Sequence, residues 1–210
     1  MPVAADDAAV ASADVVLVRH GETVYNTRNV LSGKPWNAVP LSDRGREQAA
    51  ELGRRLAGIR WAETYVTRFP RTVETLALML PDGRPAPTVI SDLDDIDVGE
   101  FEGRPREEYR TWRRSHGVDE APPGGESRLE VTERYARGLS WLAENAATPA
   151  LVVTHDQVVR YLENALQRED PVLGPVGPIP NATPYPYTRE ELAAGAAWLS
   201  AYVERGGVPA

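Results

Sequence analysis

Two histidines stand at the ends of the two segments most typical of buried strands. Apolar residues 15–18 lead into Arg19 and His20, and apolar residues 150–154 lead into His155. Short apolar runs that alternate with helical patterns are typical of parallel strands, and ligands bind outside the carboxyl ends of such strands. We therefore expect His20 and His155 to meet in one site, although 135 positions separate them.

An arginine beside a histidine suits the transfer of a phosphoryl group, which carries about two negative charges near neutral pH. Such transfer needs cationic donors on the non-bridging oxygens and a nucleophile held in line. Arginine matches phosphate geometry and stays charged, so Arg19 and Arg71 are the candidate donors. A neutral imidazole can attack phosphorus and form a phosphohistidine that water hydrolyses, which makes His20 the candidate nucleophile.

Two other interpretations of the histidines carry less weight. Either one could be a hydrogen-bonded residue at a strand end without a chemical role. A two-histidine metal site is disfavoured, because neither histidine has a second ligand at helical spacing and an adjacent arginine would repel the ion. We expect neither a metal nor a cofactor, since the arginines supply the positive charge.

The remaining sequence predicts the elements that hold these residues. Strands are expected at 15–18, 64–67, 88–90 and 150–154, and helices at 43–58, 71–80, 105–112, 127–145, after 156 and after 188. The proline-rich segment 171–186 is too broken for a helix, and part of it fits an edge strand. This alternation predicts an α/β fold of three layers, α/β/α, with a mostly parallel central sheet. We expect a flexible tail over residues 1–13 and a single catalytic domain over residues 14–210.

The composition narrows the classes of partner. A net charge of −8 argues against nucleic acid and anionic membranes as partners. No run of 18 apolar residues is present, and the first residues lack the pattern of a signal peptide. The absence of cysteine excludes disulfides and thiolate ligands, which suits a cytoplasmic enzyme. A small phosphorylated substrate is the expected partner, and a homodimer stays open.

The segment Leu17–Thr23, with the sequence LVRHGET, resembles the signature of the histidine phosphatase superfamily, which includes the cofactor-dependent phosphoglycerate mutases. Further similar pieces follow in the same order, at Asn26, Ser32-Gly33, Leu41-Ser42, Gly45, Gln48-Ala49, 67–75, 93–103 and 152–155. The resemblance implies a mutase-like three-layer fold and a phosphohistidine at His20.

The resemblance also suggests roles for single residues. It implies that Arg71 lines the phosphate pocket and that a protonated His155 stabilises the transferring group. Asn26 is expected to donate to the phosphate, and Ser32 and Gly33 to lie in the substrate-binding loop. Asn26 and Gly33 could equally only shape that loop.

The sequence departs from the resemblance at the proton donor. Asp95 stands where the family usually has glutamate, which is one methylene longer. Asp156 directly follows the second histidine, and this pair resembles the phytase-like branch, in which the aspartate is the donor. We favour Asp95, because the residues around it fit the family's acid-bearing turn. Arg68 is a second departure, at a position where proline or a small polar residue is more usual.

The fate of the phosphoryl group depends on two further segments. Residues 123–127, with the sequence PGGES, resemble a loop common in the phosphatases of the family. Arg113 and Arg114 look like the double arginine with which the mutases bind substrate, or they form a surface pair. We predict a phosphatase that acts on a small phosphorylated metabolite. The alternatives are a phosphoglycerate mutase and a catalytically impaired phosphate-binding relative.

Overall fold

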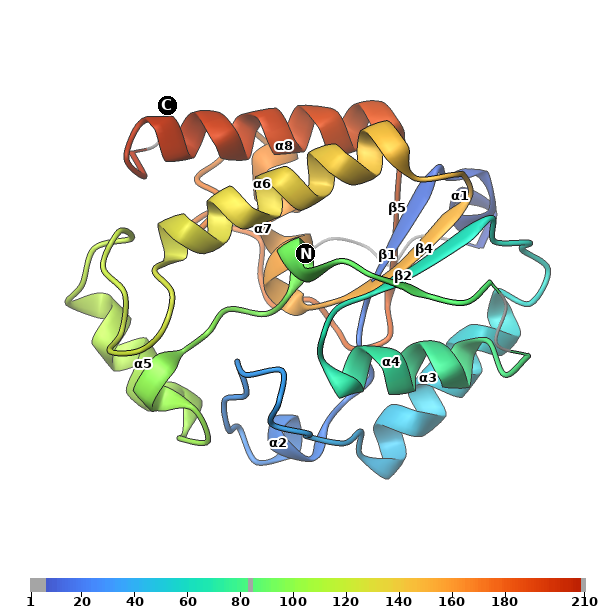
Figure 1. Ribbon diagram of the computed structural model, residues 1–210, viewed down its shortest axis with the longest axis horizontal. Helices are drawn as coiled ribbons and strands as arrows, with labels where there is room; N and C mark the ends of the chain where they lie inside the picture. Colours follow the sequence, from blue (N-terminus) through green and yellow to red (C-terminus); the bar gives the residue numbers. More distant parts are fainter. Residues whose placement is uncertain (1–6, 83–84, 209–210) are drawn as a thin grey trace.

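Five strands form one sheet in the computed structural model, which describes residues 7–82 and 85–208 (Figure 1). They are β1 (Val15–Arg19), β2 (Glu63–Val66), β3 (Thr88–Val89), β4 (Ala150–Thr154) and β5 (Pro184–Tyr187), in the order β3-β2-β4-β1-β5. The first four strands are parallel, and β5 pairs antiparallel with β1 at the edge. Arg19 lies opposite Thr154, so His20 and His155, the next residues, leave the sheet at the same edge.

Helices cover both faces of this sheet, which confirms the three-layer fold (Figure 1). The helices are α1 (Asp7–Ser12), α2 (Val24–Thr27), α3 (Asp43–Arg55), α4 (Pro70–Met79), α5 (Arg106–Arg114), α6 (Arg128–Asn145), α7 (Asp156–Leu166) and α8 (Arg189–Glu204). Val16 and Val18 of β1 pack in one hydrophobic cluster with α3 and α4. Val15 and Leu17 point to the opposite face, where they belong to the cluster that includes α6, α7 and α8. This alternation follows from the two-residue period of a strand.

The start of the chain differs from the expected flexible tail. Residues 7–12 form α1, in which Val10 is fully buried in the cluster beneath α3 and α4. Asp7 accepts a hydrogen bond from Arg55 of α3, with 2.7 Å between Oδ1 and Nη2. The expectation is therefore wrong for residues 7–12, while residues 1–6 lie outside the described residues.

Helix α5 lies to the side of the three layers (Figure 1). Main-chain hydrogen bonds tie its start to the loop that follows β1: the N–H of Arg106 donates to the carbonyl of Asn29 at 2.9 Å, and that of Leu31 donates to Arg104 at 3.0 Å. Pro105 precedes the helix and pairs with Val30 in an isolated β-bridge. These contacts fix α5 beside the carboxyl edge of the sheet. None of the described helices is long and apolar enough to cross a membrane.

Candidate active site

A pocket of about 370 Å³ lies at the carboxyl edge of the sheet. Its walls come from the loop after β1, the turn after β3, and helices α5 and α7. Seven of the eight residues predicted as site residues line it, namely Arg19, His20, Asn26, Ser32, Gly33, Arg71 and Asp95. The eighth, His155, is fully buried, and its ring centroid lies 5.4 Å from that of His20. The structure therefore brings the two histidines together.

His20 is held in one tautomer. Its Nδ1 lies 2.7 Å from the carbonyl oxygen of Gly21. Because a carbonyl only accepts, Nδ1 carries the proton and the lone pair is on Nε2. The main chain of His20 is fixed by its N–H, which donates to Thr154, and by its carbonyl, which accepts from Asn181 at 2.8 Å. Burial, with the nearby charge of Arg71, lowers the pKa of His20 well below its usual value, so the ring is neutral near pH 7.

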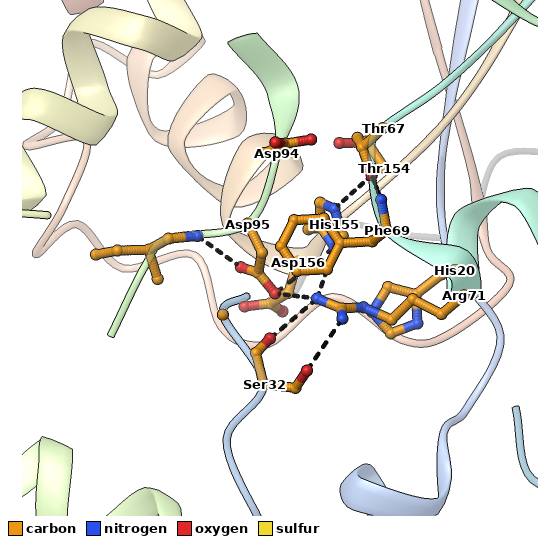
Figure 2. Close-up of polar contacts among 12 residues, drawn as sticks. His20, Ser32, Thr67, Phe69, Arg71, Asp94, Asp95, Thr154, His155 and Asp156 are labelled. Carbon is orange, nitrogen blue, oxygen red and sulfur yellow. Dashed lines mark hydrogen bonds and ion pairs between the residues drawn. The ribbon is translucent and has the colours of Figure 1, made fainter. Parts of the chain in front are cut away.

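Arg71 connects the other parts of the site (Figure 2). It lies in the first turn of α4, where Pro70 begins the helix. Its Nη2 donates to the carbonyl of Ser32 at 3.2 Å and to Oδ2 of Asp95 at 2.7 Å. The guanidinium also lies over the ring of Phe69, 4.2 Å from its centroid. Arg71 is only 3% exposed, and burial lowers its pKa, although an arginine stays charged.

His155 differs from its expected protonated state. Its Nδ1 lies 3.3 Å from Nη2 of Arg71, which can only donate, so Nδ1 is the acceptor. Its Nε2 then carries the proton and donates to Oγ1 of Thr67 at 2.9 Å. Burial and the charge of Arg71 lower the pKa of His155 well below its usual value. These contacts are those of a neutral His155, a state that depends on the tertiary contact with Arg71; the protonation of His155 beside a transferring phosphoryl group stays a prediction.

Arg19 and Asp156 are joined through the proline-rich segment. Arg19 donates to the carbonyl of Ile179, and Oδ1 of Asp156 accepts from the N–H of the same residue at 2.7 Å. Nη1 of Arg19 lies 4.0 Å from Oδ1 of Asp156. Nε of Arg19 is buried without a hydrogen-bond partner. The Asp156 carboxylate thus holds the proline-rich segment at Ile179. The Nε–H group of Arg19 remains available to donate to a ligand.

Asn26 and Gly33 have clear structural roles. Oδ1 of Asn26 accepts from the N–H of Thr23 at 3.0 Å, completing the capping box of α2. A Cβ on Gly33 would lie 2.2 Å from the carbonyl oxygen of Ile96, so only glycine fits where these chains approach. The N–H of Gly33 donates to Glu102 at 2.6 Å. Contact of either residue with a substrate stays a prediction.

Arg134 of α6 holds the main chain of the acid-bearing turn, a role not expected from sequence. It donates to three carbonyl oxygens, those of Asp92 at 3.0 Å, Asp94 at 2.9 Å and Asp95 at 3.3 Å. It also donates to both carboxylate oxygens of Glu126, at 3.0 and 2.8 Å. Glu126 belongs to the PGGES loop, so this loop fixes Asp95 indirectly. Asp95 has a shorter side chain than glutamate, and the main chain of this turn sets how far its carboxylate reaches. Its Oδ2 lies 3.6 Å from Nδ1 of His155.

We expect Arg134→Ala to destabilise the fold by about 2–3 kcal/mol, because it leaves Glu126 and three carbonyls without their donor. Urea unfolding measures this change, and hydrogen exchange of the amides at 92–98 should become faster. Arg137→Ala is the matched control, since Arg137 lies on the same helix with a side chain that is 55% exposed. Equal destabilisation by both substitutions would contradict the role of Arg134.

The pocket concentrates positive charge in a chain whose net charge is −8. The arginines that line it are Arg19, Arg71, Arg106, Arg110, Arg113 and Arg160, against the carboxylates Glu22, Asp95 and Asp156. Donors of this kind around an unprotonated imidazole nitrogen suit an in-line attack on a phosphoryl group. Of the expected arginine pair, only Arg113 lines the pocket. Arg114 is exposed and pairs with Glu107.

Comparison with known proteins gives the family. The sequence profile of the histidine phosphatase superfamily (branch 1) matches residues 15–190. The 2,3-bisphosphoglycerate-dependent phosphoglycerate mutase 2 of Gloeobacter violaceus is 30% identical over 175 residues, which cover 75% of this chain and 77% of the mutase. Fructose-2,6-bisphosphatase TIGAR B of Danio rerio is 33% identical over 128 residues, 58% of this chain. The match spans about half, 49%, of that relative's length.

A solved structure agrees with these relatives. The alpha-ribazole phosphatase from Shigella flexneri superposes with a TM-score of 0.70 at 25% identity, over 80% of this chain and 86% of that protein. Phosphatases and mutases thus both occur among the relatives. Because the matched region includes both histidines and every strand of the sheet, the chain belongs to the histidine phosphatase superfamily.

Proposed function

We propose that this protein is a phosphatase that hydrolyses a small phosphorylated metabolite through a phosphohistidine at His20, without a metal. The observation that carries the proposal is the 2.7 Å contact between Nδ1 of His20 and the carbonyl of Gly21, in a pocket with Arg19 and Arg71. This contact leaves the Nε2 lone pair free to attack. Burial keeps the ring neutral, as a nucleophile must be.

The reaction has two steps. In the first, Nε2 of His20 attacks phosphorus and the bond to the ester oxygen breaks, while Arg19 and Arg71 hold the non-bridging oxygens. The leaving oxygen takes a proton from Asp95. In the second, the Asp95 carboxylate accepts a proton from water as the water oxygen attacks phosphorus. Phosphate and neutral His20 result, and Asp95 is protonated again.

Asp95 changes partners when a substrate binds. Oδ2 of Asp95 accepts from Nη2 of Arg71 at 2.7 Å. A bound phosphoryl dianion competes for Arg71 and places negative charge beside the carboxyl group. Release from Arg71 leaves the Asp95 carboxyl group free to face the leaving oxygen.

Asp156 suits the donor role less well. Its Oδ1 already accepts from the N–H of Ile179 and lies near Arg19. Asp95, whose side chain is 24% exposed at the pocket, is therefore the proposed acid.

A mutase is the second candidate, favoured by the phosphoglycerate mutase among the relatives. Retaining a phosphoryl group requires a site that excludes water and grips the intermediate firmly. The arginine pair does not act as a unit here, because Arg114 points to Glu107 with Nη2 2.8 Å from Oε1. Because Arg114 is turned away from the pocket, the two arginines do not hold an intermediate together, which favours transfer of the phosphoryl group to water.

We expect phosphate release to exceed the conversion of 3- to 2-phosphoglycerate, with no stimulation by 2,3-bisphosphoglycerate. Both reactions are measured side by side on the same preparation, with and without the bisphosphate. A generic aryl phosphate shows whether the protein hydrolyses esters at all. Faster conversion that depends on the bisphosphate would assign the protein to the mutases instead.

A further inference from the structure

Arg68, where the sequence departs from the family, binds a buried carboxylate outside the pocket. Arg68 does not line the pocket, and its side chain is 58% exposed. Its main-chain N–H donates to Oδ1 of Asp94 at 2.9 Å, and its Nε donates to Oδ2 of the same carboxylate. A single residue thus supplies a donor to each oxygen of Asp94.

Asp94 is a carboxylate in a place that water hardly reaches. Its side chain is only 4% exposed, and it directly precedes Asp95, the proposed acid. Burial raises the pKa of Asp94, while the hydrogen bonds and the charge of Arg68 act in the opposite direction. A buried carboxylate without its cation is costly, so loss of Arg68 would force the turn to shift or Asp94 to take up a proton.

The segment that carries Arg68 also contacts the centre of the site (Figure 2). Oγ1 of Thr67 accepts from Nε2 of His155 at 2.9 Å. The ring of Phe69 contacts the ring of His155, with 4.8 Å between the centroids, and lies under the guanidinium of Arg71. Arg68 therefore lies in the middle of the segment that holds His155 and Arg71 in place.

The pair of Arg68 and Asp94 joins this segment to the turn that carries Asp95. Arg134 holds the main chain of that turn from the side of α6, through three carbonyls. Arg68 holds the same turn from the start of α4, through the side chain of Asp94. Aspartate has one side-chain torsion fewer than glutamate with which to compensate for a shift of the main chain, so the position of its carboxyl group follows the turn closely.

We propose that Arg68 is a positioning residue for the proton donor. By binding Asp94, it fixes the turn in the place from which the Asp95 carboxyl group reaches the leaving oxygen. This role rests on the proposed function, in which Asp95 is the acid. It also gives the arginine at this position a purpose, since the buried carboxylate of Asp94 needs a cation.

Arg68→Ala tests the role through the class of ester that it slows. We expect kcat/KM for alkyl phosphates to fall roughly 10- to 100-fold, the loss expected when a catalytic group moves by about 1 Å. Aryl phosphates should lose far less, because their leaving oxygen needs little protonation. Arg68→Lys keeps a cation and should recover most of the activity on alkyl phosphates. An equal loss for both classes of ester, or no loss for either, overturns the positioning role.

Arg46→Ala is the matched control, because Arg46 is another partly exposed arginine whose ion-pair partners are Glu74 of α4 and Asp43. Its dependence on the leaving group should equal that of wild type. Thermal unfolding checks that each variant is folded. In the Asp95→Asn background, Arg68→Ala should slow alkyl phosphates no further, since both substitutions remove the same function. Additive losses would mean that Arg68 acts through another group and would overturn the role.

Ligand binding separates this inference from the proposed function. Inorganic vanadate adopts the five-coordinate geometry of the transferring group, with one apical oxygen in the place of the leaving oxygen. In calorimetry, Arg68→Ala should bind vanadate roughly 10-fold more weakly than wild type and inorganic phosphate equally well. Weaker vanadate binding in the variant, together with a wild type that hydrolyses no ester, counts against the phosphatase alone. Hydrolysis by wild type, with vanadate binding and leaving-group dependence unchanged in Arg68→Ala, counts against the positioning role alone.

Discussion

His20→Ala is expected to lose phosphatase activity by roughly a thousandfold or more, because the route through a covalent intermediate disappears. Wild type that is quenched with denaturant during turnover of a labelled substrate should carry acid-labile, base-stable phosphate. The variant should carry none. Nε2 of His20 is the only nitrogen of the two buried histidines that has neither a hydrogen-bond partner nor a proton in the described site.

The third histidine provides the control for this experiment. His116 stacks on Trp112, with 4.1 Å between the ring centroids, and does not line the pocket. His116→Ala should therefore keep both the label and the activity. Label that persists in His20→Ala would assign the nucleophile to another residue.

Asp95→Asn is expected to slow the hydrolysis of alkyl phosphates by roughly 10²- to 10⁴-fold, because their leaving oxygen needs a proton in the transition state. Aryl phosphates should be affected far less at the first step, since a phenolate leaves readily. The measurement is the dependence of kcat/KM on the pKa of the leaving group. It should be nearly flat in wild type and steep in the variant.

Asp156→Asn serves as the comparison for Asp95. Its amide oxygen can still accept from the N–H of Ile179, so the proline-rich segment should keep its place. We expect a mild effect that is similar for both classes of ester. The opposite result, with a steep dependence only in Asp156→Asn, would move the acid to Asp156 and bring the site closer to the phytase-like branch.

The sequence predicted the layers of the fold because each element is encoded locally. The bounds of β4 match the apolar run at 150–154, and Thr188 caps α8 through the capping box with Glu191. Helix ends were less exact: the helix expected to reach residue 58 ends at Arg55. Helix α1 was missed because the burial of Val10 depends on elements far along the chain.

The centre of the site could also be predicted, since His20 and His155 follow strands that share a sheet edge. The protonation states of His20 and His155 could not be predicted from the sequence, because they depend on burial and on the charge of Arg71 nearby. Arg160 gave no signal, since a single arginine on an amphipathic helix is typical of a solvated face. Of the α5 arginines that line the pocket, Arg113 was indicated by its resemblance to the double arginine of the mutases, and the spacing of Arg106, Arg110 and Arg113 is a second pattern that places all three on one face.

The position of α5 outside the three layers has a consequence for how specificity can change. The helix is tied to the loop after β1 through main-chain atoms, which do not depend on the side chains that face the pocket. Arg106 and Arg113 can therefore be exchanged while Arg71, His155 and the sheet beneath them stay as they are. One wall of the pocket thus lies on a piece of the chain separate from the two histidines, so selection or design could change that wall by replacing one face of a nine-residue helix.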